Sequence, residues 1–205
     1  MTCSVDASFW AICLIAFFGM FRKSHLLPTS TKSFNPAKQL TKEDFRFYPW
    51  GILLTIRWSK TIQFRERVVQ IPLPRIPNSP LCPVEACTRA FRFTIHTPGN
   101  SQAFNWLQQS SLTIRSFTYS MFTDKLRAIL RDLGYPPHSY GGQSFRRGGA
   151  SFAYQAGVPI ELIKVLGDWR SDAVLLYLTI PLTIRLQSIN LLTKSILSTF
   201  PLNTT

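Results

Sequence analysis

The sequence predicts an α+β domain that is mainly helical and surrounds a small antiparallel β-hairpin. Two short apolar runs, residues 51–56 and 68–73, have the composition of strands. The segment between them is polar and contains Lys60, so the two runs are expected to pair as a hairpin that presents this lysine. Elsewhere the apolar residues recur at helical spacing, with glycine and proline between the segments.

The first helix is expected over residues 7–20. Its run 9–20 (FWAICLIAFFGM) is apolar on every side. A membrane span needs about 20 such residues, so the run is too short to cross a bilayer. It also lacks the basic flank and the small-residue cleavage site of a signal peptide. The sequence therefore predicts a helix that is buried in the core.

Further helices are expected over residues 83–91, 144–156, 159–166 and 170–178, and an amphipathic one over 182–198, whereas 28–44 reads as a loop. Residues 120–133 form another amphipathic pattern, which Gly134 and Pro136 end. Its apolar face consists of Met121, Phe122, Leu126, Ile129, Leu130 and Leu133. We expect one domain over residues 1–180 and a C-terminal helix and tail over 181–205.

The charge of the chain points to a polyanionic partner. Lys and Arg number 23 against 10 Asp and Glu, a formal net charge of +13. Nucleic acid is the first candidate and an anionic membrane the second. The four cysteines are too sparse for a disulfide scaffold and no second Cys or His pair lies at zinc spacing. We interpret Cys3, Cys13, Cys82 and Cys87 as reduced packing residues and expect no metal site.

The segment from 142 to 177 carries the residues best suited to phosphate chemistry. Arg146 lies in a glycine-rich stretch, and Trp169 and Tyr177 follow within about 35 residues of Gly142. An arginine can hold a phosphate through charge-assisted hydrogen bonds, and a phenol can attack one. A histidine would serve best three residues before Arg146, and Gln143 stands there.

In their order along the chain, these residues resemble the catalytic domain of the tyrosine recombinases (phage-integrase family), particularly those of eukaryotic mobile elements. The resemblance covers residues 8–180 and predicts that family's catalytic-domain fold. The first family arginine matches Arg22 in Gly19-Met20-Phe21-Arg22-Lys23-Ser24, and the hairpin lysine matches Lys60. The His-x-x-Arg box matches Gln143-Ser144-Phe145-Arg146. The second His-or-Trp position falls on Asp168 or Trp169 after Gly167, and the nucleophile position on Tyr177.

The resemblance implies a DNA strand transferase that works without a cofactor, a metal or a small-molecule substrate. Arg22 and Arg146 would stabilise the charge on the phosphate, and Tyr177 would form a 3′-phosphotyrosyl link. Lys60 would protonate the leaving 5′-oxygen. The expected DNA-backbone contacts are Lys23, Arg147, Lys164 and Arg170. Double-stranded DNA is the implied partner, no membrane is expected, and a homo-oligomer on DNA is left open. The compartment would be the nucleus in a eukaryotic host and otherwise the cytoplasm.

The chain departs from the family pattern at two positions. Gln143 can donate a hydrogen bond but cannot transfer a proton, and loss of such a group costs about 10²–10⁴-fold in rate. The sequence thus leaves open whether the chain is an active enzyme. His25 stands where the family often has an acidic residue. The family's N-terminal DNA-clamping domain has no counterpart in this sequence, which suggests a fragment or a decayed copy of a mobile element.

Two other functions compete with this interpretation. Residues 148–166 have the spacing of a helix-turn-helix, which would suit a catalytically inactive DNA-binding module. A membrane-associated protein would instead expose the run 9–20 next to Arg22. Individual residues also have simpler interpretations. Tyr177 and Trp169 could be packing residues, and Arg22 and Lys60 could be solvated charges.

Overall fold

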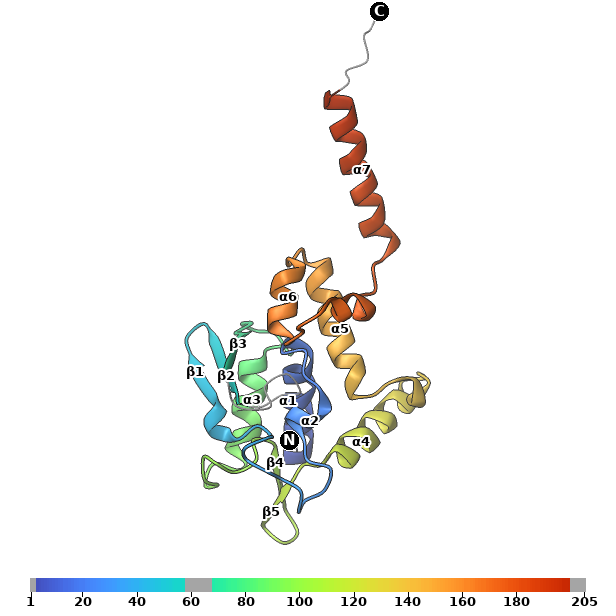
Figure 1. The fold of residues 1–205 in the computed structure, drawn as a ribbon. Helices are drawn as coiled ribbons and strands as arrows, with labels where there is room; N and C mark the ends of the chain where they lie inside the picture. The colour runs from blue at the N-terminus through green and yellow to red at the C-terminus, as the bar shows by residue number, and fades with distance from the viewer. Residues whose placement is uncertain (1–2, 58–67, 200–205) are drawn as a thin grey trace, which may run out of the picture.

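The buried helix α1 (Ser4–Phe18) is the centre of the fold in this computed structural model, which describes residues 3–57 and 68–199. Its side chains from Ala11 to Ala16 are all buried, which confirms the predicted core helix. The other elements surround it (Figure 1). The membrane-associated alternative required an exposed 9–20 segment, whereas most of this segment is buried and Trp10 is its exposed residue.

A three-stranded antiparallel sheet covers one side of the molecule, with the order β1-β2-β3. Strands β2 (Gly51–Ile56) and β3 (Val69–Pro74) are the predicted hairpin, and Ile56 pairs with Val69 at the end next to the connecting segment. The pairing turns Ile52, Leu54, Ile71 and Leu73 into the core. Strand β1 (Phe45–Tyr48) was not predicted, because only Phe45 of its four residues is buried.

A second sheet of two strands, β4 (Asn105–Gln108) and β5 (Thr113–Ser116), was also not predicted. These strands are short and mixed in polarity, so they carry no clear alternation. Two serines of α1 hold the first of them: Ser4 Oγ donates to the Leu107 carbonyl at 2.8 Å and Ser8 Oγ to the Asn105 carbonyl at 2.7 Å. Polar groups of the buried helix thus fix the position of this sheet.

The remaining helices lie close to their predicted ranges. They are α3 (Pro83–Arg92), α4 (Tyr119–Asp132), α5 (Gly142–Gln155), α6 (Ile160–Leu166) and α7 (Leu182–Thr199). The one-turn helix α2 (Lys23–Leu26) was not predicted. Short 3₁₀-helices lie at η1 (Lys42–Asp44), η2 (Pro137–Ser139) and η3 (Asp172–Tyr177). The prediction of an α-helix over 170–178 was wrong in type, because η3 is a 3₁₀-helix that begins only after Ser171.

Two predictions about packing also need correction. On α4, Phe122 and Leu126 are buried, but Ile129 and Leu133 at the end of the expected apolar face are exposed. Cys13, Cys82 and Cys87 are buried free thiols, whereas Cys3 is exposed and is not a packing residue. Helix α7 has no buried residue and extends away from the rest of the chain (Figure 1).

Among the residues that the structure describes, no helix is long and apolar enough to cross a membrane.

The close approach of α5 to the end of α1 depends on Gly149. A β-carbon at this position would lie 2.1 Å from the Phe17 carbonyl oxygen, which is backbone and cannot turn aside. At the adjacent Gly148 the nearest atom would be a ring carbon of Phe17 at 3.5 Å, an ordinary contact. Gly148 therefore has room for a β-carbon, whereas Gly149 does not.

This difference predicts opposite effects of the same substitution. Gly149→Ala is expected to lower the free energy of unfolding by about 1–3 kcal/mol, because the two helices must move apart. Gly148→Ala is expected to leave it unchanged or raise it by up to about 1 kcal/mol, since alanine favours the helix. Chemical denaturation of both variants measures this, and equal effects would contradict the close packing.

Candidate active site

Arg146 of α5 is the centre of the candidate site and is only 1% exposed. Its Nη1 donates a hydrogen bond to the carbonyl of Met20, 126 residues earlier. Its Nε and Nη2 have no hydrogen-bond partner among the residues that the structure describes. A buried guanidinium that keeps free donors is costly unless a further acceptor completes it. The free donors of Arg146 therefore suit an anionic ligand.

Two aromatic rings hold this guanidinium. The Cζ of Arg146 lies 3.6 Å from the centroid of the Trp169 ring and 5.8 Å from that of Tyr177. The two rings also contact each other, with centroids 5.5 Å apart and planes at 60°. Gly167 makes room for the indole, because a β-carbon there would lie 1.7 Å from a Trp169 ring carbon. Both Trp169 and Tyr177 belong to a small core cluster, so they pack and contact Arg146 at the same time.

The turn that ends α1 brings Arg22 to the same place. Met20 has a left-handed φ of 49°, and the Phe21 N–H donates to the Ala16 carbonyl at 3.1 Å. This turn directs the Met20 carbonyl toward Arg146 and is followed at once by Arg22. One Nη of Arg22 is buried and has no hydrogen-bond partner in the described part of the chain. The site thus holds two arginines with unused donors.

Burial, together with the charges of the site, shifts two pKa values. Burial and the positive charge of Arg22 lower the pKa of Arg146 to about 10, while Tyr177 and Asp168 act in the opposite direction. Arg146 therefore stays charged at neutral pH. Burial lowers the pKa of His25 to about 4, with smaller contributions in the same direction from Arg22 and Arg146 and an opposing one from Asp168. His25 is therefore neutral at pH 7.

His25 and Arg146 line one small cavity with Asp168, and Ile56 and Val69 of the β2–β3 hairpin also line it. The strand ends that lead into and out of the connecting segment of the hairpin thus lie beside the site. Lys60 lies within residues 58–67, outside the described residues, so the structure says nothing about its position. Asp168 itself has a left-handed φ of 52° and directly precedes Trp169.

The other predicted residues lie around this centre. Gln143 and Arg147 are exposed on α5, one turn before Arg146 and directly after it. Lys164 of α6 makes an ion pair with Asp172 at 2.9 Å, and Arg170 is exposed. Lys23 begins α2. The structure therefore brings together Arg22, Arg146, Asp168, Trp169 and Tyr177 and leaves Gln143 at the surface.

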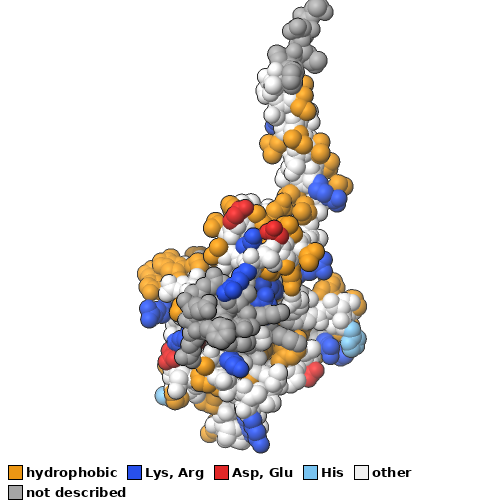
Figure 2. Space-filling model, in the orientation of Figure 1, with side chains coloured by type: hydrophobic (Ala, Val, Ile, Leu, Met, Phe, Trp, Pro, Cys, Tyr) orange, Lys and Arg blue, Asp and Glu red, His pale blue; other side chains and the backbone are white. Residues whose placement is uncertain are grey.

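A hollow of about 600 Å³ opens next to Trp169, and its lining includes Lys164 and Arg170. Figure 2 shows Lys and Arg side chains near the base of the projecting helix, where α5 and α6 lie. Lys164 on α6 and Arg170, which follows α6, were both predicted as DNA contacts. They border the same hollow as the indole of Trp169. The lining of this hollow also contains Glu161 and Asp168, so the two basic side chains lie in a hollow of mixed charge.

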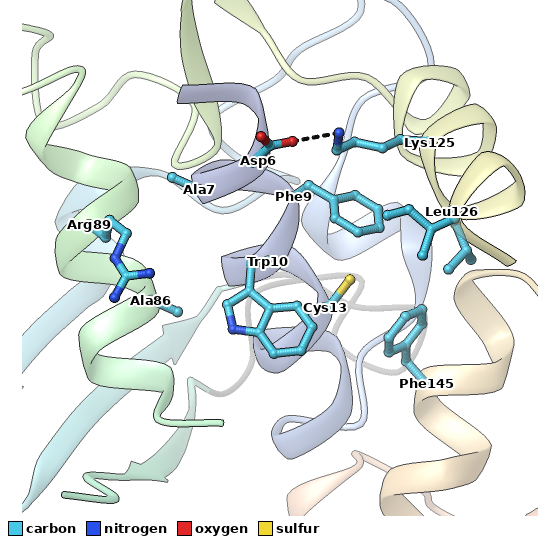
Figure 3. A pocket seen from close by; sticks show the side chains of 11 residues that line it. Asp6, Ala7, Phe9, Trp10, Cys13, Ala86, Arg89, Lys125, Leu126 and Phe145 are labelled. Atoms are coloured by element: carbon cyan, nitrogen blue, oxygen red, sulfur yellow. Dashed lines mark ion pairs between the residues drawn. The ribbon is translucent and has the colours of Figure 1, made fainter. Parts of the chain in front are cut away.

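A second hollow, of about 380 Å³, lies away from Arg146 between α1, α3 and α4 (Figure 3). Its floor is apolar, with Phe9, Trp10 and Cys13 from α1. An ion pair at 2.6 Å between Asp6 and Lys125 borders it. No residue that the sequence assigned to chemistry lines this groove.

Comparisons with known proteins give a match only at the level of structure. No protein-family model and no curated protein matches the sequence. The XerH site-specific recombinase, in a structure bound to its difH substrate, matches with a TM-score of 0.59 and 15% identity over 93% of this chain. The Tn1549 transposon integrase, in complex with circular intermediate DNA, matches with a TM-score of 0.55 and 14% identity over 89% of this chain.

The fold is that of the tyrosine-recombinase catalytic domain. This confirms the predicted α+β fold class and the resemblance on which it rested. The chain spans about half the length of the matched recombinase, 48% of XerH and 59% of the integrase.

Sequence reasoning missed two parts of this site. The Met20 carbonyl, which accepts from Arg146, carries no sequence signal because it is backbone. Ser151 of α5 bonds the backbone on both sides of Leu178, with Oγ 3.1 Å from the Tyr177 carbonyl and 2.9 Å from the Thr179 nitrogen. Its position five residues after Arg146, on the same helix, was the only available signal.

The low pKa of His25 predicts a pH-dependent stability. The folded-state pKa of about 4 lies below the ordinary 6.5, so the unfolded chain takes up this proton more readily. The associated stability is complete above about pH 6.5 and is lost as the pH falls toward 4. Between pH 7.5 and 5 the loss is about 2 kcal/mol.

Urea unfolding of the wild type and of His25→Gln at both pH values measures this effect. The variant lacks the titrating group, so its stability relative to the wild type is expected to rise by that amount at the lower pH. A difference between the two proteins that does not change with pH would contradict the buried, neutral imidazole.

Proposed function

We propose that this chain is the catalytic domain of a site-specific DNA recombinase or integrase, which breaks and rejoins double-stranded DNA through a 3′-phosphotyrosyl intermediate. The observation that carries the proposal is the pair of arginines with unused donors, Arg22 and Arg146, with Tyr177 in ring contact with Arg146. The net charge of +13 supports a polyanionic substrate.

The chemistry follows from these three side chains. The free donors of Arg146 and Arg22 would bind the non-bridging oxygens of a phosphodiester and stabilise the charge that builds up there. The Tyr177 oxygen would form a bond to phosphorus while the bond from phosphorus to the 5′-oxygen breaks. The phosphotyrosyl bond conserves the energy of the phosphodiester, so the 5′-hydroxyl of a new strand can reverse the step.

The leaving 5′-oxygen requires a proton, which we assign to Lys60 on the resemblance of its hairpin to that of the family. The amide of Gln143 can only donate a hydrogen bond. His25 does not replace the missing imidazole as an acid at pH 7, because burial keeps it neutral. This site would thus have fewer groups able to transfer a proton than the family pattern provides.

DNA is the proposed substrate because the matched structures are DNA complexes: XerH is bound to difH and the integrase to circular intermediate DNA. Lys164 and Arg170, which line the hollow beside Trp169, would contact the DNA backbone. We assign the same role to Arg147, exposed on α5, and to Lys23.

A homo-oligomer on DNA is part of the proposal. Helix α7 projects from the domain with its apolar side chains exposed (Figure 2), among them Leu186, Ile189 and Leu192 at more than half of their full area. A second copy is the simplest cover for such a surface. Sedimentation of the chain on a DNA duplex, with and without residues 181–205, measures this association.

A catalytically inactive DNA-binding module is the second candidate. Gln143 favours it, and so does the arrangement of α5 and α6, which are joined by a turn at Gly157 with a φ of 83°. In a helix-turn-helix the second helix enters the major groove. Such a module would bind DNA without forming a covalent bond to it.

A nicked suicide DNA substrate distinguishes the two functions, because the cleaved strand is lost and the covalent complex accumulates. The wild type is expected to form a covalent adduct with DNA, and Tyr177→Phe to form none while binding DNA with unchanged affinity. Tight, salt-sensitive binding without any adduct would favour the inactive module.

The substitution Gln143→His is expected to raise the rate of adduct formation by about 10²–10⁴-fold, because it restores a group that can transfer a proton. Single-turnover cleavage of the same substrate measures the rate. Gln143→Asn is the control, since it keeps an amide and should not accelerate the reaction. An equal response of both variants would show that position 143 takes no part in proton transfer.

A further inference from the structure

Ser151 of α5 makes two hydrogen bonds to the segment that follows η3. Its Oγ donates to the Tyr177 carbonyl at 3.1 Å and accepts from the Thr179 N–H at 2.9 Å. A hydroxyl has one proton and two lone pairs, so it can make both bonds at once. Ser151 is 7% exposed, and water therefore competes little for either bond.

Both hydrogen bonds lie where the backbone changes from the 3₁₀-helix η3 to an extended conformation. Tyr177 is the last residue of η3, and Leu178 is already extended with φ −74° and ψ 130°. A carbonyl at the end of a helix has no partner within that helix. Ser151 supplies this partner for Tyr177 and also bonds the chain two residues later. Gln155, one turn further along α5, adds a longer and exposed bond of 3.3 Å to the Thr179 carbonyl.

The side chain of Tyr177 lies against Trp169 and interacts with Arg146. Its described ring neighbours are Trp169 at 5.5 Å and the guanidinium of Arg146 at 5.8 Å. Ring contacts of this kind allow a range of orientations. The bonds of Ser151 thus limit where the Tyr177 backbone can lie, and they do so from the helix that carries Arg146. A displacement of about 1 Å in a reacting group can cost about 10²-fold in rate.

We propose that Ser151 is a positioning residue, which holds the backbone around Tyr177 against α5 and so places the phenol beside Arg146 of the same chain. The proposal rests on the proposed function, in which Tyr177 is the nucleophile. Ser151 bonds the backbone of Tyr177 and Thr179 and would act on the reaction through Tyr177.

The first test compares Ser151→Ala with Gln155→Ala in single-turnover cleavage of the suicide substrate. Ser151→Ala is expected to slow adduct formation about 10²-fold with unchanged DNA affinity. Gln155→Ala, which loses only the exposed bond, should change the rate less than about threefold. Ser151→Thr keeps the hydroxyl and should restore most of the rate. An unchanged rate in Ser151→Ala overturns the proposal while the proposed function stands.

The second test separates positioning from support of the whole site. In a Tyr177→Phe background, hydrogen peroxide replaces the phenol: its oxygen bonds to phosphorus, the bond to the 5′-oxygen breaks, and that oxygen takes up a proton. This cleavage needs the arginines but not the tyrosine, so adding Ser151→Ala should leave it unchanged. An equal loss in both reactions would overturn the positioning role.

Amide hydrogen exchange tests the contact without any catalysis. In Ser151→Ala the amide of Thr179 is expected to exchange faster, whereas amides within α5 keep their protection. Unchanged exchange at Thr179 overturns the proposal even if the wild type cleaves DNA. Faster exchange at Thr179 in a wild type that forms no adduct would instead refute the proposed function and leave the contact established.

Discussion

The hydrogen bond from Arg146 to the Met20 carbonyl is the interaction on which the site depends. It joins the end of the buried helix α1 to α5, two segments 126 residues apart in sequence. The turn that provides the carbonyl requires a left-handed Met20, and the Phe21 N–H closes it onto Ala16. Because α1 is fixed in the core on nearly every side, this turn has a defined position. The position of this turn also fixes that of Arg22, two residues later. Helix α5 packs against the end of α1 at Gly149.

Aromatic contacts hold the guanidinium of Arg146 in addition to its hydrogen bond to Met20. A guanidinium buried without partners would destabilise the fold by several kcal/mol. The indole of Trp169 offsets part of this cost through a cation–π contact at 3.6 Å, which reaches about 2 kcal/mol where water is excluded. Trp169 in turn packs over Gly167 and against Tyr177. The candidate nucleophile is therefore part of the same packing unit as the arginine, which explains why η3 lies where it does.

Much of the fold could be predicted from the sequence, and the reasons for the failures are physical. The apolar α1 and the strands β2 and β3 have composition and length that favour one structure. Strands β1, β4 and β5 do not, since four residues of mixed polarity become strands only through their partners. In the site, Arg22, Arg146 and Tyr177 were expected from the family resemblance, and the structure places them near one another. The positions of His25, Ser151 and the Met20 carbonyl depend on contacts between distant segments, which spacing does not reveal.

The groups that hold Arg146 have a consequence for how the molecule attracts an anion. Arg146 contacts a backbone carbonyl and two aromatic rings, and the carboxylate of Asp168 lies close enough to raise its pKa. The carbonyl and the rings are neutral, so they fix the geometry without removing the positive charge. In a buried, low-dielectric setting that charge acts over a longer range than a surface arginine would. Arg22 and Arg146 thus give a positive electrostatic potential at the end of α1, which Asp168 offsets in part.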